Sequence, residues 1–206
     1  MSAREEILSR VRSAKVTPTD HQTRRDYAHT VMLADPVGMF VERVEDYKAT
    51  VIRTNAAGVA AAVAESLTGA VRVVIPAGFD KKWVPDSIDN VRDEPALSSE
   101  ELNAVDAVLT NATVGIAVTG TIVLDHTEGQ GRRALTLVPD LHVCVLSADQ
   151  IVGDVPEAVA RLSASVAAGR PLTWVSGPSA TVDIELIRVH GVHGPRTLRI
   201  VLVESA

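Results

Sequence analysis

The segment SGPSATVD, residues 176–183, concentrates the small polar residues that surround bound anions in proteins. It follows an expected strand at residues 172–175, and Pro178 can begin a short helix whose free backbone N–H groups would hold a phosphate or carboxylate. The alternatives are a capped turn without a ligand, and a strand, since TVDIELIRV alternates in polarity. The residues predicted to bind the anion here are Ser176, Gly177, Ser179 and Thr181.

A second glycine turn, within VTGTIVLD, separates two apolar runs. At Gly120 the backbone can approach a ligand closely, beside the hydroxyls of Thr119 and Thr121, although a tight hairpin also requires glycine. The polar loop HTEGQGRR follows and carries Arg132 and Arg133, and paired arginines can clamp a carboxylate or phosphate. We expect these five residues to contribute to ligand binding, with the loop either a lid or a solvated hairpin tip.

Three residues near these turns have side chains suited to acid–base chemistry. Asp183 and Glu185 are two residues apart and face the same way on a strand, so either carboxylate can act as a general base. His193, in VHGVHGPRTL, can line the same site. This segment supplies two histidines, but a metal centre needs three or more ligands and the glycines and proline prevent a regular helix. We therefore take Asp183, Glu185 and His193 as catalytic candidates and expect no metal.

A strand start at PDLH places a carboxylate and an imidazole two residues apart, at Asp140 and His142. On a strand both side chains point to the same face, so Asp140 can orient the His142 ring. The alternative that we favour is a histidine at the edge of the sheet with a backbone partner.

The elements that must position these residues alternate between strands and helices, which predicts βαβ units and a mostly parallel sheet. We expect an α/β fold with helices on both faces of this sheet. The apolar strands at 71–75, 141–146 and 198–203 are expected at its centre. Expected helices begin near residues 2, 36, 56, 98 and 155, and the last of them would bury the stripe Val155, Val159, Leu162 and Val166.

Composition restricts the function. The single cysteine, Cys144, excludes an internal disulfide and an iron–sulfur or zinc-thiolate site made by this chain alone. A formal net charge of −6 argues against nucleic acid. With no apolar segment of about 18 residues and no signal peptide, a membrane span is not expected, and a cytoplasmic location is. We divide the chain into an N-terminal helix and arm, 1–30, and a single α/β domain, 31–206.

Several segments together resemble the LUD-domain proteins of the lactate utilisation protein C group, also described as LutC- or YkgG-like. They are TGTIVL, RRALTLVPDLHVCVL, DQIV and SGPSATVDIELIRVHGVHGPRTLRIVLV, and they agree in order and spacing. Matching segments follow one another closely over residues 112–203, whereas residues 30–111 match only in their alternation of strands and helices. It implies the fold of the NagB/RpiA/CoA-transferase-like superfamily.

The resemblance also implies a role in oxidation of L-lactate to pyruvate together with iron–sulfur partner proteins. This chain would be the cluster-free accessory subunit, without a cofactor of its own, and its sheet-end loops would bind a small anion. The resemblance supplies no catalytic residue. Two alternatives stay open: an independent transferase or isomerase, with Glu128 or Glu185 as a carboxylate nucleophile, and a pure interaction scaffold.

Overall fold

The computed structural model describes residues 2–14, 26–181 and 189–205. Two of the catalytic candidates, Asp183 and Glu185, lie outside these residues. Within the described part of the chain, no helix has the length and apolar character that crossing a membrane requires.

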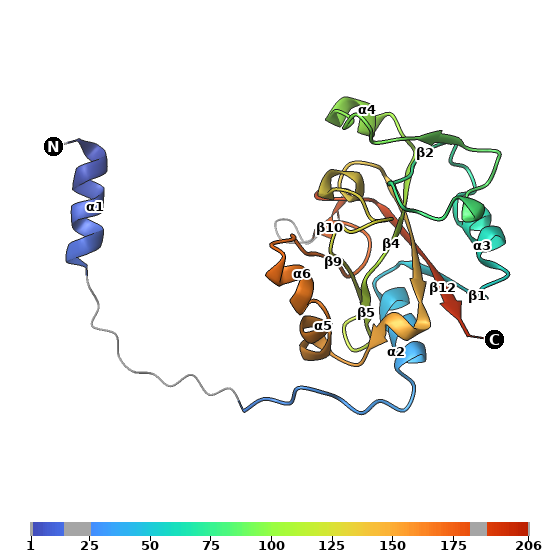
Figure 1. Cartoon of the computed structure of the whole chain (residues 1–206), viewed down its shortest axis with the longest axis horizontal. Helices are drawn as coiled ribbons and strands as arrows, with labels where there is room; N and C mark the ends of the chain where they lie inside the picture. Colours follow the sequence, from blue (N-terminus) through green and yellow to red (C-terminus); the bar gives the residue numbers. More distant parts are fainter. Residues whose placement is uncertain (1, 15–25, 182–188, 206) are drawn as a thin grey trace.

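The centre of the molecule is a six-stranded sheet in the order β1-β12-β7-β4-β2-β3, in which every neighbouring pair is parallel (Figure 1). This confirms the expected parallel sheet. Of the three apolar strands expected at its centre, β7 is central, whereas β12 and β2 are interior strands that each lie one strand from an edge. The strands are β1 (Thr50–Asn55), β2 (Arg72–Val74), β3 (Asp89–Val91), β4 (Ala107–Asn111), β7 (Leu141–Ser147) and β12 (Thr197–Glu204).

One face of this sheet is covered by a helix. Because successive side chains point to opposite faces of a strand, Val143, Val145 and Val201 form one core cluster with Val59 and Val63 of α3. The 3₁₀ helix η1 adds Trp83 at the margin of this cluster. The elements are α3 (Val59–Ser66) and η1 (Lys81–Trp83).

The other face packs mainly against a second, mixed sheet, where a helical layer was expected. Cys144, Leu146 and Ile200 form a cluster there with Ile122 and with Phe40 of α2. The two apolar runs around Gly120 explain the difference, because they fold back as an antiparallel hairpin, β5–β6, instead of crossing over through a helix. The elements are α2 (Pro36–Asp46), β5 (Val114–Ile116), β6 (Thr121–Leu124), β8 (Ile151–Val152) and β9 (Thr173–Val175).

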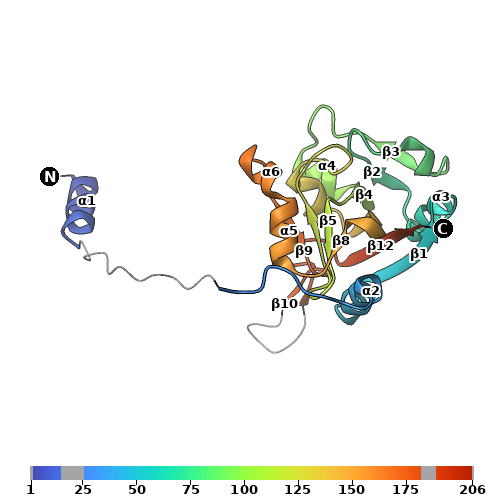
Figure 2. The ribbon, with the colours of Figure 1, turned by 60° about the horizontal axis from the view of Figure 1, so that its bottom comes forward.

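A further pair of helices covers the outside of the small sheet, so that α3 and α5 lie on opposite sides of the two sheets (Figures 1 and 2). The helix expected to begin near residue 155 is divided into α5 (Val155–Arg161) and α6 (Ser163–Ala167). The predicted apolar stripe was partly wrong: Val159 and Val166 are 53% and 56% exposed, whereas Ala158 and Ser165 are buried. Ser165 is turned inward because its hydroxyl donates a hydrogen bond to Asp125.

The other elements are the helix α1, which has 11 residues, and several shorter segments. The helices expected to begin near residues 2 and 98 are present as α1 and α4, and each starts with a capping box, at Ser2 and at Ser98. α4 has only five residues, and strand β4 follows soon after it. These elements are α1 (Ala3–Ser13), α4 (Ser99–Asn103), η2 (Arg133–Thr136), η3 (Ala148–Gln150), β10 (Ala180–Thr181) and β11 (Val189–His190).

A histidine is buried in the middle of the main sheet. His142 is 1% exposed in the central strand β7, not at an edge, and its Nε2 lies 2.8 Å from the Thr110 hydroxyl. Asp140 points elsewhere and forms an ion pair of 3.4 Å with Arg196. Burial lowers the pKa of His142 from 6.5 to about 4, because the charged imidazolium loses its hydration.

This burial predicts an acid-sensitive stability. Above pH 6.5 His142 is neutral in both states. Between pH 6.5 and 4 the unfolded chain binds a proton that the folded chain does not, so the free energy of unfolding falls, by about 3 kcal/mol in total. In denaturant titrations at several pH values, His142→Gln should lose less stability than the wild type across this window. The exposed histidine variant His29→Gln should behave as the wild type. If the free energy of unfolding of His142→Gln falls between pH 6.5 and 4 as steeply as that of the wild type, the lowered pKa of His142 is not the cause.

Candidate functional site

The carboxyl ends of the six parallel strands meet at one edge of the sheet, where ligands bind in open α/β proteins. Residues 126–131, the loop between β6 and η2, lie over this edge. The backbone N–H of Asn111, at the end of β4, donates to the Gly129 carbonyl at 2.8 Å. The N–H of Gly129 donates in turn to the carbonyl of Ala77, which follows β2, at 2.7 Å. The loop therefore bridges the ends of two neighbouring strands.

A buried carboxylate braces the start of this loop. Asp125 is 3% exposed, and one of its oxygens accepts hydrogen bonds from the hydroxyls of Thr113 at 2.8 Å and Thr127 at 2.7 Å. Its other oxygen accepts from Ser165 and lies 3.7 Å from the Arg170 guanidinium. Burial alone would raise the pKa of Asp125, but the hydrogen bonds from Ser165, Thr127 and Thr113 outweigh burial and lower this pKa to about 2. Asp125 is thus held as a structural anion.

A buried amide completes the brace. The Gln130 carbonyl oxygen accepts from the backbone N–H groups of Asp125 at 2.8 Å and His126 at 3.1 Å. Its NH₂ group donates to the hydroxyls of Thr113 and Thr127 at 2.8 and 3.1 Å. All of these groups are fixed inside the fold, so the tip of the loop has a defined position over the sheet edge.

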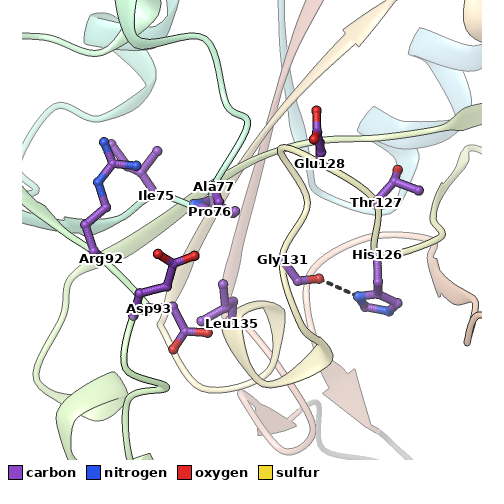
Figure 3. A pocket seen from close by; sticks show the side chains of 11 residues that line it. Ile75, Pro76, Ala77, Arg92, Asp93, His126, Thr127, Glu128, Gly131 and Leu135 are labelled. Atoms are coloured by element: carbon purple, nitrogen blue, oxygen red, sulfur yellow. Dashed lines mark hydrogen bonds between the residues drawn. The ribbon is translucent and has the colours of Figure 1, made fainter.

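His126 fastens the loop to the small sheet. Its Nδ1 lies 2.7 Å from the Gly131 carbonyl, as Figure 3 shows, and its Nε2 lies 2.8 Å from the Thr173 hydroxyl of β9. The residue has a positive φ of 59°, which is uncommon for a side chain other than glycine. Both ring nitrogens already have partners, so we assign His126 a positioning role.

Two hollows flank the loop tip and share Thr127 and Glu128. The first, called the Arg92 hollow, has a volume of about 300 Å³ and lies between Arg92, after β3, and His126 (Figure 3). The second, called the Trp83 hollow, has a volume of about 460 Å³ and includes the ends of β4, β7 and β12. Both volumes are in the range of small-molecule sites. The structure therefore offers binding space on each side of Glu128.

The paired arginines of the loop have separate surroundings. Arg132 forms a bidentate pair with Asp93, at 2.7 and 3.0 Å, and donates to the Leu97 carbonyl at 2.5 Å. Burial alone would raise the pKa of Asp93, but the hydrogen bonds from Arg132 and the Leu97 N–H lower it. Arg132 thus clamps the segment 93–97, whereas the Arg133 guanidinium makes a longer contact, of 3.4 Å, with the Thr136 hydroxyl.

Arg133 is one of five predicted site residues that meet in a third hollow, of about 160 Å³, called the Arg133 hollow. The five are Arg133, Ser176, Gly177, Ser179 and His193. The backbone N–H of His193 donates to the Ser179 hydroxyl at 3.0 Å, which joins the two predicted segments. Pro195, which also lines the hollow, precedes β12. The site therefore lies toward the amino ends of the parallel strands, opposite the edge expected for it, because β9 belongs to the small sheet.

The helix expected at Pro178 is absent. Bends at residues 177 and 178 lead into β10, which pairs antiparallel with β11 through Ala180 and Thr181. The alternative strand interpretation, made for residues 181–189, is correct for Thr181 and Val189, and residues 182–188 lie outside the described part of the chain. An anion at this hollow would meet side-chain hydroxyls and Arg133, and it would gain nothing from a helix N-terminus.

The second glycine turn connects to the Arg133 hollow through hydroxyl groups. The Thr121 hydroxyl lies 2.7 Å from that of Thr119 and 2.7 Å from that of Ser176. Gly120 itself approaches helix α2 and not a hollow, because a Cβ on it would lie 2.7 Å from backbone and side-chain atoms of Arg43. Thr119 and Thr121 thus position Ser176.

Comparison with known proteins identifies the family. Residues 70–203 match the sequence model of the LUD domain. The chain belongs to the LUD-domain family. This confirms the resemblance found in the sequence, and the matched residues of the LUD domain include the loop 126–131 and all three hollows.

Several proteins are similar to this chain over different shares of its length. "Lactate utilization protein C" of Deinococcus radiodurans is 52% identical over 82% of this chain and 80% of its own length. An uncharacterized protein of Neisseria meningitidis is 28% identical over 98% of this chain and 94% of its own. YkgG of Escherichia coli is 30% identical over 54% of this chain and 51% of its own length. A crystal structure of a DUF162 family protein from Deinococcus radiodurans has 44% identity and a TM-score of 0.74, covering 84% of this chain and 99% of that one.

Three residues that line the carboxyl-edge hollows were not predicted from the sequence: Arg92, Asn111 and Trp83. Arg92 and Asn111 stand at the ends of strands β3 and β4, so the rule that strand ends carry ligands could have found them. Trp83 lies in a short 3₁₀ helix and has no such signal. Among the described residues, no group of three or more His, Cys, Asp or Glu side chains is arranged as a metal site.

The brace at Asp125 can be tested by substitution. Asp125→Asn should lower the free energy of unfolding by about 2–4 kcal/mol, because an NH₂ group would face hydroxyl donors in a buried place. The matched variant Asp140→Asn, which breaks an exposed ion pair of 3.4 Å, should cost at most about 1 kcal/mol. Denaturant unfolding of both variants measures the difference. Equal, small losses would show that the loop does not depend on Asp125.

Proposed function

We propose that this LUD-domain protein is the cluster-free accessory subunit of an L-lactate oxidation system that acts with iron–sulfur partner proteins. The observation that carries the proposal is the 52% identity, over 82% of the chain, to a protein named for lactate utilisation. The chain contributes one thiol, Cys144, which is fully buried and whose pKa burial raises to about 12. Electron-carrying clusters therefore belong to the partners in this proposal.

We further propose that a small carboxylate, lactate or its product, binds in the Arg133 hollow. Arg133 supplies the positive charge, and Ser176 and Ser179 supply hydroxyls that can donate to a carboxylate or accept from a hydroxyl group. No carboxylate side chain is among the described residues that line this hollow. A volume of about 160 Å³ suits a ligand smaller than the drug-sized molecules that occupy roughly 300–1,000 Å³.

The N-terminal helix supports a docking role. None of the residues of α1 is buried, and Ile7 and Val11, one turn apart, are 62% and 65% exposed. Side chains at this spacing lie on the same face of a helix, and an apolar face of this kind fits a groove on another protein. In this proposal, α1 attaches the subunit to an iron–sulfur partner.

The ligand proposal predicts a specific loss of affinity. In isothermal titrations with lactate and pyruvate, Arg133→Ala should weaken binding about 10- to 100-fold, because a hydrogen bond to a charged group contributes about 1.5–3 kcal/mol. Arg92→Ala removes a cation from the opposite edge of the sheet and should leave the affinity unchanged. Wild-type protein that releases no heat with either acid, or an Arg133→Ala variant that binds normally, would contradict the ligand proposal.

The partner proposal is tested by co-expression with the iron–sulfur proteins of the same lactate system. The full chain should co-purify with their visible cluster absorbance, and lactate oxidation should require it. Ile7→Asp combined with Val11→Asp should reduce co-purification at least tenfold, whereas the matched pair Glu6→Ala and Arg10→Ala, on the same helix, should not. If lactate oxidation proceeds fully without this chain, the accessory role is wrong. If the double variant Ile7→Asp and Val11→Asp co-purifies as well as the matched pair does, the partner docks at a surface other than α1.

A further inference from the structure

The Trp83 hollow has a chemistry opposite to that of the Arg133 hollow. Its walls come from the ends of three central strands, at Asn111, Ser147 and Val203, and from the loop tip at Glu128. Trp83 closes one side with a half-buried indole ring. Glu128 is the one charged side chain among the described residues that line this hollow, so a small anion such as lactate is repelled from it.

Two polar side chains of this hollow are unpartnered, although their neighbours are satisfied. Gln130 and Gln150 use their amide groups in hydrogen bonds within the fold, and the hydroxyl of Thr113 is bonded to Asp125 and Gln130. Within the described part of the chain, the Glu128 carboxylate and the Asn111 carboxamide have no hydrogen bond or ion pair. These two groups are free to meet a ligand.

The backbone places the two residues next to each other at the rim of the hollow. The Asn111 N–H is bonded to the carbonyl of Gly129, the residue after Glu128. A Cβ on Gly129 would lie 2.4 Å from the Asn111 side-chain nitrogen, and a Cβ on Gly78 would lie 2.6 Å from the Glu128 Cβ. The loop tip is thus packed closely from below, while the Glu128 side chain is exposed. A ligand in the hollow therefore meets both side chains on a stretch of backbone that is already fixed.

The donor and acceptor inventory defines the ligand. A carboxylate only accepts hydrogen bonds, and a carboxamide both accepts and donates. Two adjacent hydroxyl groups match this set, since each can donate to Glu128 and one can also accept from Asn111; an acidic residue binds ribose hydroxyls in the same way in dinucleotide sites. The indole of Trp83 provides an apolar wall for a sugar ring or a base.

We propose that the Trp83 hollow binds a ligand with adjacent hydroxyl groups, held by Glu128 and Asn111. The hydroxyls belong to a free sugar or to the ribose of a nucleoside, and both present the same diol. This site is separate from the Arg133 hollow and does not rest on the lactate proposal.

The test titrates the full-length protein with ribose, adenosine and 2′-deoxyadenosine, and binding is followed by calorimetry or by the change in tryptophan fluorescence that is absent from a Trp83→Phe variant. Binding of ribose or adenosine in the millimolar range or tighter is expected, and the deoxy analogue, which lacks the diol, should bind at least tenfold more weakly than adenosine. Adenosine binding without ribose binding identifies a nucleoside, and binding of both with similar affinity identifies the sugar alone as the recognised part.

Variants assign this binding to the hollow. Glu128→Ala and Asn111→Ala should each weaken diol binding at least tenfold, whereas the matched variant Glu100→Gln, at an exposed glutamate of α4, should not. Thermal unfolding of Glu128→Ala should match the wild type, because its side chain is exposed and unpartnered. The proposal is overturned if neither ribose nor adenosine binds, if the deoxy analogue binds as tightly as adenosine, or if Glu128→Ala retains wild-type affinity.

Discussion

The hydrogen-bond network of Asp125 and Gln130 determines where the functional parts of this molecule lie. A buried carboxylate and a buried amide would destabilise the fold if they were unpaired. Here each is satisfied by hydroxyl and backbone groups of Thr113, which precedes β5, of Ser165 in α6, and of the loop and its start. The loop 126–131 is therefore built into the core at its base and reaches solvent only at its tip. Both hollows at the carboxyl edge take their shape from this arrangement.

Local patterns predicted much of the fold. The parallel sheet follows from strands such as LHVCVL and TLRIVLVE, whose apolar residues fill both faces, and the helix starts expected near residues 2 and 98 are stabilised by caps between residues three apart. Ion pairs and strand pairings between residues distant in sequence were not predicted. Nothing in the segment around Arg132 indicates its pairing with Asp93, and nothing in β9 indicates that it pairs antiparallel with β6. The small sheet, which replaced an expected helical layer, depends on such long-range pairing.

The candidate site shows the same division. The sequence identified Arg133, Ser176, Gly177, Ser179 and His193 by residue type, and the structure brings them to one hollow. The sequence did not predict at which edge of the main sheet these residues lie, because their position depends on the direction of β9 in the small sheet. The Arg133 hollow and the Trp83 hollow have complementary chemistry. The first offers a cation and hydroxyls, and the second offers a carboxylate, an amide and an indole, which matches the acid proposed for one and the neutral diol proposed for the other.

The strand order also has a consequence for synthesis of the protein. β1 is the first strand of the main sheet in the chain, and its neighbour in that sheet is β12, the last. While a ribosome produces the intervening residues, the backbone groups of β1 have no strand to pair with, and contacts so distant in sequence form slowly. The nascent chain thus carries an open sheet edge until β12 inserts between β1 and β7. A chaperone that shields this edge would act on the protein before the main sheet is complete.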